Sequence, residues 1–113
     1  MTQYYETLRE FRTKNFTVKV AATVDIDYDM SWLSPKERQD IYNGDLGIYL
    51  IRVQVIHRKL GEVGVDYLGG CVYNNIYDFV KERKSYFADM INTACADARD
   101  NIRGMTLPYV RNV

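Results

Sequence analysis

The sequence contains few of the residues that carry metal or covalent chemistry. Its 113 residues include one histidine, His57, and two cysteines, Cys71 and Cys95. A metal site needs several ligands, and an activated nucleophile needs a base placed beside it. No glycine-rich phosphate-binding motif occurs either. We therefore expect no catalytic residues, no metal site and no cofactor, and we interpret His57 as a surface residue at the end of a strand.

Long apolar runs are also missing, and charge of neither sign is in excess. No run approaches the roughly 20 apolar residues of a membrane span, and the N-terminus lacks the apolar core of a signal peptide. Fifteen basic residues balance fifteen acidic ones, which argues against broad attraction to nucleic acid or an anionic membrane. We expect a cytoplasmic protein with no membrane partner. In that compartment Cys71 and Cys95 are expected as small buried hydrophobes rather than as a disulfide across the core.

What the sequence does contain is typical of one globular domain. Hydrophobic residues make up 47% and charged residues 27% of the chain, which is ordinary composition for a folded domain. We predict a single α+β domain over residues 1–113, with the least ordered stretches at 1–14 and 105–113.

The most regular helical pattern covers Asn75 to Arg103. Its apolar residues recur at steps of three and four, which predicts an amphipathic helix with one buried face. The residues are Ile76, Phe79, Val80, Phe87, Met90, Ile91, Ala94, Ala98 and Ile102. We expect one long helical segment, with a bend or break near 83–85 and an end at Gly104.

Three segments have the period of two that is typical of strands. Residues 16–28 alternate almost without a break, and residues 45–58 and 62–73 alternate on either side of a tight turn at 59–61. The short turn predicts an antiparallel hairpin. Gly69 and Gly70 predict a bulge, or a place where another element approaches the backbone closely.

Two shorter helices are expected. Ser34, Pro35 and Glu37 stand in the order of a capping box, and Gly44 supplies the stop. Residues 2–11 have apolar side chains at helical spacing, which favours a short N-terminal helix. The predicted fold is thus a three-stranded antiparallel sheet with a short helix between strands one and two and the long C-terminal helix packed on one face.

An acidic strand end is the first candidate for binding a partner. Asp25, Asp27 and Asp29 alternate along the polar face of the first expected strand, and Asp45 follows the short helix. Carboxylates at alternate positions stand about 7 Å apart. Three interpretations are open: a solvated strand end, a patch that docks a basic partner, or a divalent metal site. The patch is our candidate for partner docking.

Aromatic residues give the second candidate, because the chain has ten tyrosines. Tyr73 and Tyr77 flank the junction between the last strand and the long helix, either as packing or as a binding surface. Trp32 is either an exposed anchor or a residue at the edge of the core, and the core is favoured, because a lone tryptophan in a small domain usually supplies buried area.

The sequence resembles small proteins carried by bacteriophages and prophages. The resemblance covers about residues 16–100 and rests on the block FTVKVAATVDIDYDMSWL, the turn YNGD, and GVDYLGGCVYN before the amphipathic helix. It implies a mobile-element origin without a known catalytic motif. Small phage proteins of this kind often bind a host machine, including CRISPR and restriction systems.

Together these features predict a non-enzymatic protein that binds a host protein or nucleoprotein complex, for example as an inhibitor of a bacterial defence system such as CRISPR-Cas. Two alternatives remain open: a nucleic-acid-binding module of αβββα order, for which the chemistry fits less well than the order, and a structural or assembly component of a virion. A homodimer is also open, because exposed tyrosines and a free strand edge allow self-association.

Overall fold

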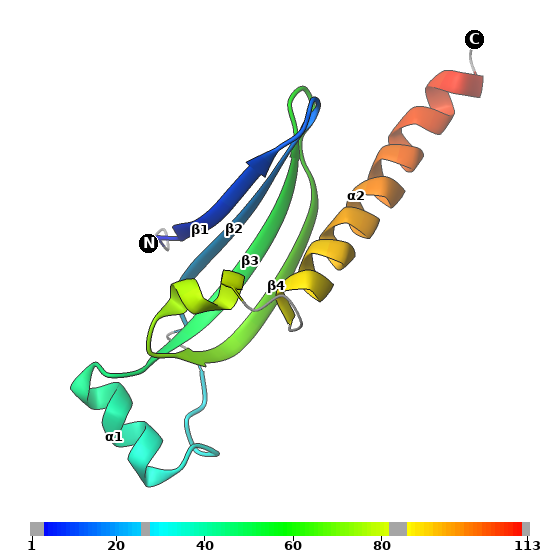
Figure 1. Ribbon diagram of the computed structural model, residues 1–113. Helices are drawn as coiled ribbons and strands as arrows, with labels where there is room; N and C mark the ends of the chain where they lie inside the picture. The colour runs from blue at the N-terminus through cyan, green and yellow to red at the C-terminus, as the bar shows by residue number, and fades with distance from the viewer. Residues whose placement is uncertain (1–3, 26–27, 82–85, 112–113) are drawn as a thin grey trace.

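The protein is an antiparallel sheet flanked by helices (Figure 1). The computed structural model describes residues 4–25, 28–81 and 86–111, with side chains up to residue 105. In chain order the elements are β1 (Glu6–Arg12), β2 (Phe16–Val24), α1 (Pro35–Asn43), β3 (Gly47–His57), β4 (Gly61–Tyr73), the 3-10 helix η1 (Ile76–Lys81) and α2 (Tyr86–Arg111). The fold class is α+β, as predicted.

The four strands form a meander in the order β1-β2-β3-β4, each antiparallel to its neighbour. The helix α2 packs along β4 and, to a smaller extent, β3, while η1 lies against β1 and β4. The apolar core lies between the sheet and these two helices, on what we call the helix face. Its largest fully buried side chains are Phe79, Ile51, Val20 and Val53.

The first prediction that fails is the N-terminal helix at residues 2–11. Residues Glu6–Arg12 form the strand β1, so the sheet has four strands rather than three. The register with β2 shifts between Thr7 and Arg9, which leaves Leu8 as the extra residue of a bulge. Leu8 and Phe11 therefore both pack on the helix face. Their spacing of three imitates a helix turn, although the backbone is extended.

The long helical segment consists of two elements. Residues 76–81 form η1 and α2 begins at Tyr86, while the bend or break expected at 83–85 lies outside the described residues. The predicted buried face of the helix is nevertheless confirmed, because Phe87, Met90, Ala94 and Ala98 are all buried. Gly104 does not end the helix, which continues to Arg111 because Gly104 keeps a helical backbone.

Several local predictions are confirmed. The side chain of Ser34 accepts a hydrogen bond from the amide of Glu37, whose carboxylate accepts one from the Ser34 amide, and Gly44 ends α1 with φ 84°. β3 and β4 form the expected hairpin. The β3–β4 register shifts opposite Gly69 and Gly70, where Gly70 has φ 67°, so the paired glycines do form a bulge.

The contact between α2 and β4 is unusually close at Gly64. A Cβ atom there would lie 2.8 Å from the amide nitrogen of Ala98 and would overlap the carbonyl oxygen of Ala94. Two hydrogen bonds join the elements beside it: the Val65 amide donates to Asp97 Oδ2 over 3.1 Å, and Asn101 Nδ2 donates to the Val63 carbonyl over 2.6 Å. Beyond this contact α2 diverges from the sheet (Figure 1), which makes the molecule elongated, 63 × 27 × 24 Å.

Candidate functional site

The segment between β2 and β3 projects from one end of the sheet as an arm, defined here as residues 28–46 (Figure 1). Its helix α1 buries none of its residues. Trp32 and Tyr42 have 61% and 74% of their surface exposed. The expectation that Trp32 lies at the edge of the core is therefore wrong, because the arm carries it away from the sheet. Two large aromatic side chains instead stand in solvent on this arm.

The base of the arm contacts the sheet. Leu33 is buried, and the ring of Tyr28 lies directly on the backbone of Gly70, where an added Cβ would come within 2.5 Å of the ring. Tyr28 also contacts Trp32 edge to face, with 5.8 Å between ring centroids. The close approach predicted at the paired glycines is thus made by the arm, and it fixes where Trp32 stands.

Asp25 and Asp29 do not lie on a strand, because β2 ends at Val24. Asp25 Oδ2 accepts the amide hydrogen of Gly70 over 3.0 Å and so links the base of the arm to the β4 bulge. Asp29 accepts hydrogen bonds from the backbone amide and the hydroxyl of Ser31, which lower the pKa of its carboxyl. Asp45 is exposed just after α1. Asp27 lies outside the described residues.

The two candidate tyrosines lie away from the arm. Tyr73 packs edge-on against Phe79, with 6.1 Å between centroids, so it takes part in core packing. The hydroxyl of Tyr77 donates to Glu6 Oε1 over 2.6 Å, which ties η1 to β1 and raises the pKa of Tyr77. The structure brings Asp25 and Asp29 to one end of the molecule and places both tyrosines in roles that stabilise the fold.

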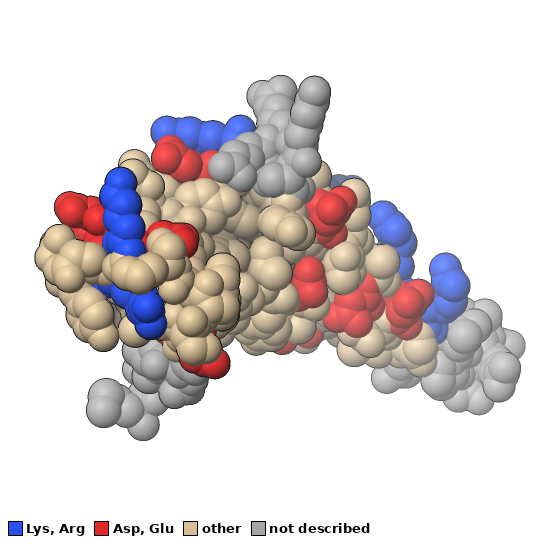
Figure 2. All heavy atoms as spheres, turned by 90° about the horizontal axis from the view of Figure 1, so that it is seen from below, with Lys and Arg blue, Asp and Glu red and all other residues tan. Residues whose placement is uncertain are grey.

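The charge on the arm is moderately negative. Residues 28–46 contain four acidic residues and two basic ones, a net charge of −2. In Figure 2, which looks onto this end of the molecule, Lys and Arg side chains lie among Asp and Glu side chains. The arm therefore offers exposed apolar side chains surrounded by charged side chains of both signs.

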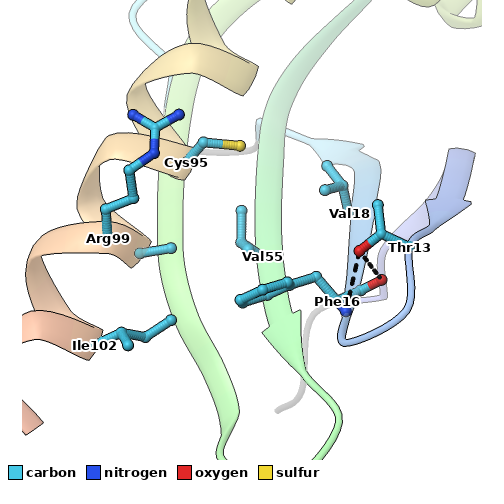
Figure 3. Close-up of a pocket in the computed structure, with 8 residues that line it drawn as sticks. Thr13, Phe16, Val18, Val55, Cys95, Arg99 and Ile102 are labelled. Carbon is cyan, nitrogen blue, oxygen red and sulfur yellow. Dashed lines mark hydrogen bonds between the residues drawn. The ribbon is translucent and has the colours of Figure 1, made fainter. Parts of the chain in front are cut away.

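A second feature of the surface is an apolar groove of about 220 Å³ on the helix face (Figure 3). The strands supply its floor, the β1–β2 hairpin one wall and α2 the other. Cys95 and Ile102 point into it from α2, and Phe16 points into it from β2. The full lining is Thr13, Phe16, Val18, Val55, Cys95, Ala98, Arg99 and Ile102.

Both cysteines are free and half-buried beside the core. Burial, and secondarily the negative charge of Asp25, raises the pKa of the Cys71 thiol to about 11. Cys71 is therefore a weak nucleophile near neutral pH. His57 Nδ1 accepts the amide hydrogens of Lys59 and Leu60 over 3.1 and 3.3 Å, and its ring packs on Phe16. His57 thus shapes the β3–β4 turn.

Within the described residues, no three histidine, cysteine, aspartate or glutamate side chains are grouped so that they could hold a metal ion. None of the helices in the described part of the chain is both long and apolar enough to cross a lipid bilayer.

The sequence interpretation ranked an exposed Trp32 second to a core position, and it did not identify Tyr42 or the groove. A signal for the exposed aromatic residues was present, since Pro35–Asn43 has no apolar stripe with which a helix could pack. The groove had no such signal, because it depends on how far α2 lies to one side of the sheet.

No protein-family model matches this chain, and it has no significant match among curated proteins or solved structures. The class that the fold defines is an α+β protein with a four-stranded antiparallel meander and a C-terminal helix.

Proposed function

We propose that this chain is a non-enzymatic binding protein whose arm docks onto a partner protein. One observation carries the proposal: α1 buries none of its residues, while Trp32 and Tyr42 on the same arm are largely exposed. A helix with no buried residue still has a complete capping box and a glycine stop. Those features are explained if the arm presents its aromatic residues to another molecule.

The energetics of interfaces support this assignment. Tryptophan and tyrosine are the residues most enriched among side chains that dominate binding energy. The arm presents them in a defined geometry, because Tyr28 is seated on Gly70 and α1 is capped at both ends. A preorganised binding element loses less conformational entropy on association than a flexible loop.

The partner is expected to offer a cleft with apolar and basic side chains. The apolar part matches Trp32 and Tyr42, and the basic part matches the net charge of −2 on the arm and the exposed Asp45. The resemblance to phage and prophage proteins supplies the setting. We propose a host protein or nucleoprotein complex as the partner, with inhibition of a defence system such as CRISPR-Cas as the outcome.

A second candidate function is binding of single-stranded nucleic acid on the face of the sheet opposite the helices. Arg52 stacks under Tyr5, with 3.8 Å from the guanidinium carbon to the ring centroid. Tyr67 is paired with Arg52 across the strands and is 54% exposed. Aromatic and cationic side chains on an open sheet are a common platform for stacked bases. The balanced overall charge makes this the weaker candidate.

The proposal is tested with three variants of the tagged chain: Trp32→Ala, Tyr42→Ala and Leu60→Ala. Leu60 is a matched control, since it is an exposed apolar residue at the other end of the sheet. Each is expressed in bacteria that carry CRISPR-Cas immunity against a test phage, and the plating efficiency of that phage is measured. Complexes are also captured from the same cells, with and without nuclease.

We expect the unmodified chain and Leu60→Ala to restore the plating efficiency of the phage and to retain one complex after nuclease treatment. Trp32→Ala and Tyr42→Ala should neither restore plating nor retain the complex. For a purified pair, each truncation should weaken binding by at least about 30-fold, which corresponds to the 2 kcal/mol of an interface hot spot. Equal binding by all four proteins would refute the role of the arm. Capture of nucleic acid alone, lost on digestion and weakened by Tyr67→Ala, would favour the second candidate.

A further inference from the structure

The two hairpin turns at the end of the sheet opposite the arm form one basic surface. We call this surface the basic tip and define it as residues 12–16 and 57–61. It contains no acidic residue and four basic ones, which are Arg12, Lys14, Arg58 and Lys59. All four are exposed. The net charge of zero for the whole chain therefore conceals a separation, with positive charge at the basic tip and a net charge of −2 on the arm.

The two turns of the basic tip are joined to each other. The amide of Arg58 donates to the carbonyl of Asn15 over 3.0 Å. The rings of Phe16 and His57 pack edge to face, with 5.1 Å between centroids. His57 Nδ1 also accepts two amide hydrogens within its own turn, and Figure 1 shows the β1–β2 and β3–β4 turns side by side. The positive side chains therefore extend from one ordered surface rather than from two independent loops.

Most of this positive charge is not neutralised within the part of the chain that the structure describes. Arg12 is paired with Glu10 over 3.2 Å. Glu62, which follows the β3–β4 turn, accepts a hydrogen bond from Gln54 over 2.8 Å. Three basic residues of the tip are in no ion pair among the described residues, namely Lys14, Arg58 and Lys59. The tip thus has three cations that are free to contact an anion.

We propose that the basic tip binds the phosphate backbone of double-stranded nucleic acid without regard to sequence. Neighbouring strands lie about 4.8 Å apart, so the four strand ends extend over about 14 Å. A duplex carries one charge per about 1.7 Å of its axis, which gives about eight phosphates over that length. Each unpaired cation can therefore contact a phosphate of its own, while electrostatic repulsion turns the negative arm away from the duplex.

The chemistry of the tip favours a duplex over a single strand or a membrane. Single strands are bound largely through aromatic rings that stack on bases. The rings of the tip, Phe16 and His57, are half-buried and packed on each other. Contacts to phosphates need no such rings. Leu60 is a single exposed apolar side chain, which is an ordinary feature of a protein surface. This duplex contact is separate from the proposed docking of the arm.

The salt dependence of binding counts the phosphate contacts. Fluorescence anisotropy measures the affinity of the chain for a labelled DNA duplex of about 20 base pairs over a range of salt concentrations. The logarithm of the association constant should fall against the logarithm of salt concentration with a slope of about −0.9 per contact, hence about −2.7 for three contacts. The affinity should therefore weaken about 20-fold between about 50 and about 150 mM salt. A second duplex of unrelated sequence should bind equally well.

Two tip variants and one matched control locate the contacts. Arg58→Gln combined with Lys59→Gln should reduce the slope to about −0.9, and Lys14→Gln should reduce it to about −1.8, because each neutralised side chain removes one contact. The control, Lys36→Gln combined with Arg38→Gln, removes the same two charges from the arm and should leave the slope unchanged. The replaced tip side chains are exposed, so the melting temperature should stay within about 3 °C of that of the unmodified chain.

Four results would overturn the proposal. The first is no binding at about 50 mM salt with up to about 1 mM chain. The second is an equal loss in the control and in the double tip variant, because binding would then follow total charge. The third is tighter binding of a single strand that Tyr67→Ala weakens and the tip variants do not, which would place nucleic acid on the face opposite the helices.

The fourth result is binding to vesicles of equal parts phosphatidylserine and phosphatidylcholine that the tip variants abolish, without binding to the duplex. That result would assign the basic tip to a membrane surface instead. Trp32→Ala should leave duplex binding unchanged, because Trp32 lies on the arm at the other end of the sheet. Failure of the tip and failure of the arm are therefore distinguishable.

Discussion

Replacing Gly64 with alanine tests the contact that positions α2. The new methyl group would overlap the carbonyl oxygen of Ala94 and lie 2.8 and 2.9 Å from the amide nitrogen and Cβ of Ala98. Ordinary contacts of a Cβ atom lie between 3.4 and 4 Å. Two of the three atoms belong to the helix backbone and cannot rotate away, so the whole helix has to withdraw.

The loss of stability comes from the contacts between α2 and β4 that this withdrawal disturbs. Overpacking of a well-packed contact costs about 1–3 kcal/mol. The displaced helix also weakens the bonds from Val65 to Asp97 and from Asn101 to Val63, each worth about 1 kcal/mol. We expect Gly64→Ala to lower the free energy of unfolding by about 2–4 kcal/mol and the melting temperature by about 8–16 °C.

Gly104→Ala is the matched control, since a Cβ at Gly104 meets nothing within 4 Å and the residue lies inside α2 with a helical backbone. This variant should gain about 0.5–1 kcal/mol from helix propensity. Urea denaturation followed by circular dichroism measures both variants. A Gly64→Ala protein within about 0.5 kcal/mol of the unmodified chain would refute the close approach of α2 to β4.

Three further predictions concern single groups. The pKa of Cys71 is raised to about 11 from 9.0, so the stability that its buried thiol contributes should be lost as the pH rises from about 9 to about 11. The alkylation rate of Cys71 should therefore have a midpoint near pH 11. A midpoint near pH 9 in the folded chain would contradict this prediction. Ser34→Ala should destabilise α1 by about 1 kcal/mol and speed amide hydrogen exchange in its first turn. The free energy of global unfolding, measured in urea, should stay unchanged, because α1 buries none of its residues. Glu6→Gln should return the pKa of Tyr77 toward its ordinary value in an ultraviolet titration, because the carboxylate that accepts the phenol hydrogen is gone.

How much the sequence predicts depends on whether a feature is local. The capping box at Ser34, the stop at Gly44 and the bulge at Gly70 are set by residues within a few positions of one another, and all three were predicted correctly. The strand β1 was mistaken for a helix because a bulge at Leu8 changed which residues face the core. That bulge exists only in the pairing with β2, which the sequence of β1 does not contain.

The candidate site was predicted only in part, for the same reason. Alternation suggested a row of carboxylates, but Asp25 is engaged by the amide of Gly70, 45 residues away along the chain. The exposure of Trp32 follows from where the arm leaves the sheet. Features of this kind depend on tertiary placement, and residue type alone does not give them.

The order of the strands has a consequence for how the chain folds. Every strand pairs with its neighbour in the sequence, so each hairpin can close over a short loop, apart from the longer connection that contains α1. Of the described elements, the covering helix α2 is synthesised after all four strands. Until it docks, the apolar face around Val53 and Val55 is open to other chains. During synthesis, the protein therefore depends on rapid arrival of its C-terminal helix to avoid aggregation.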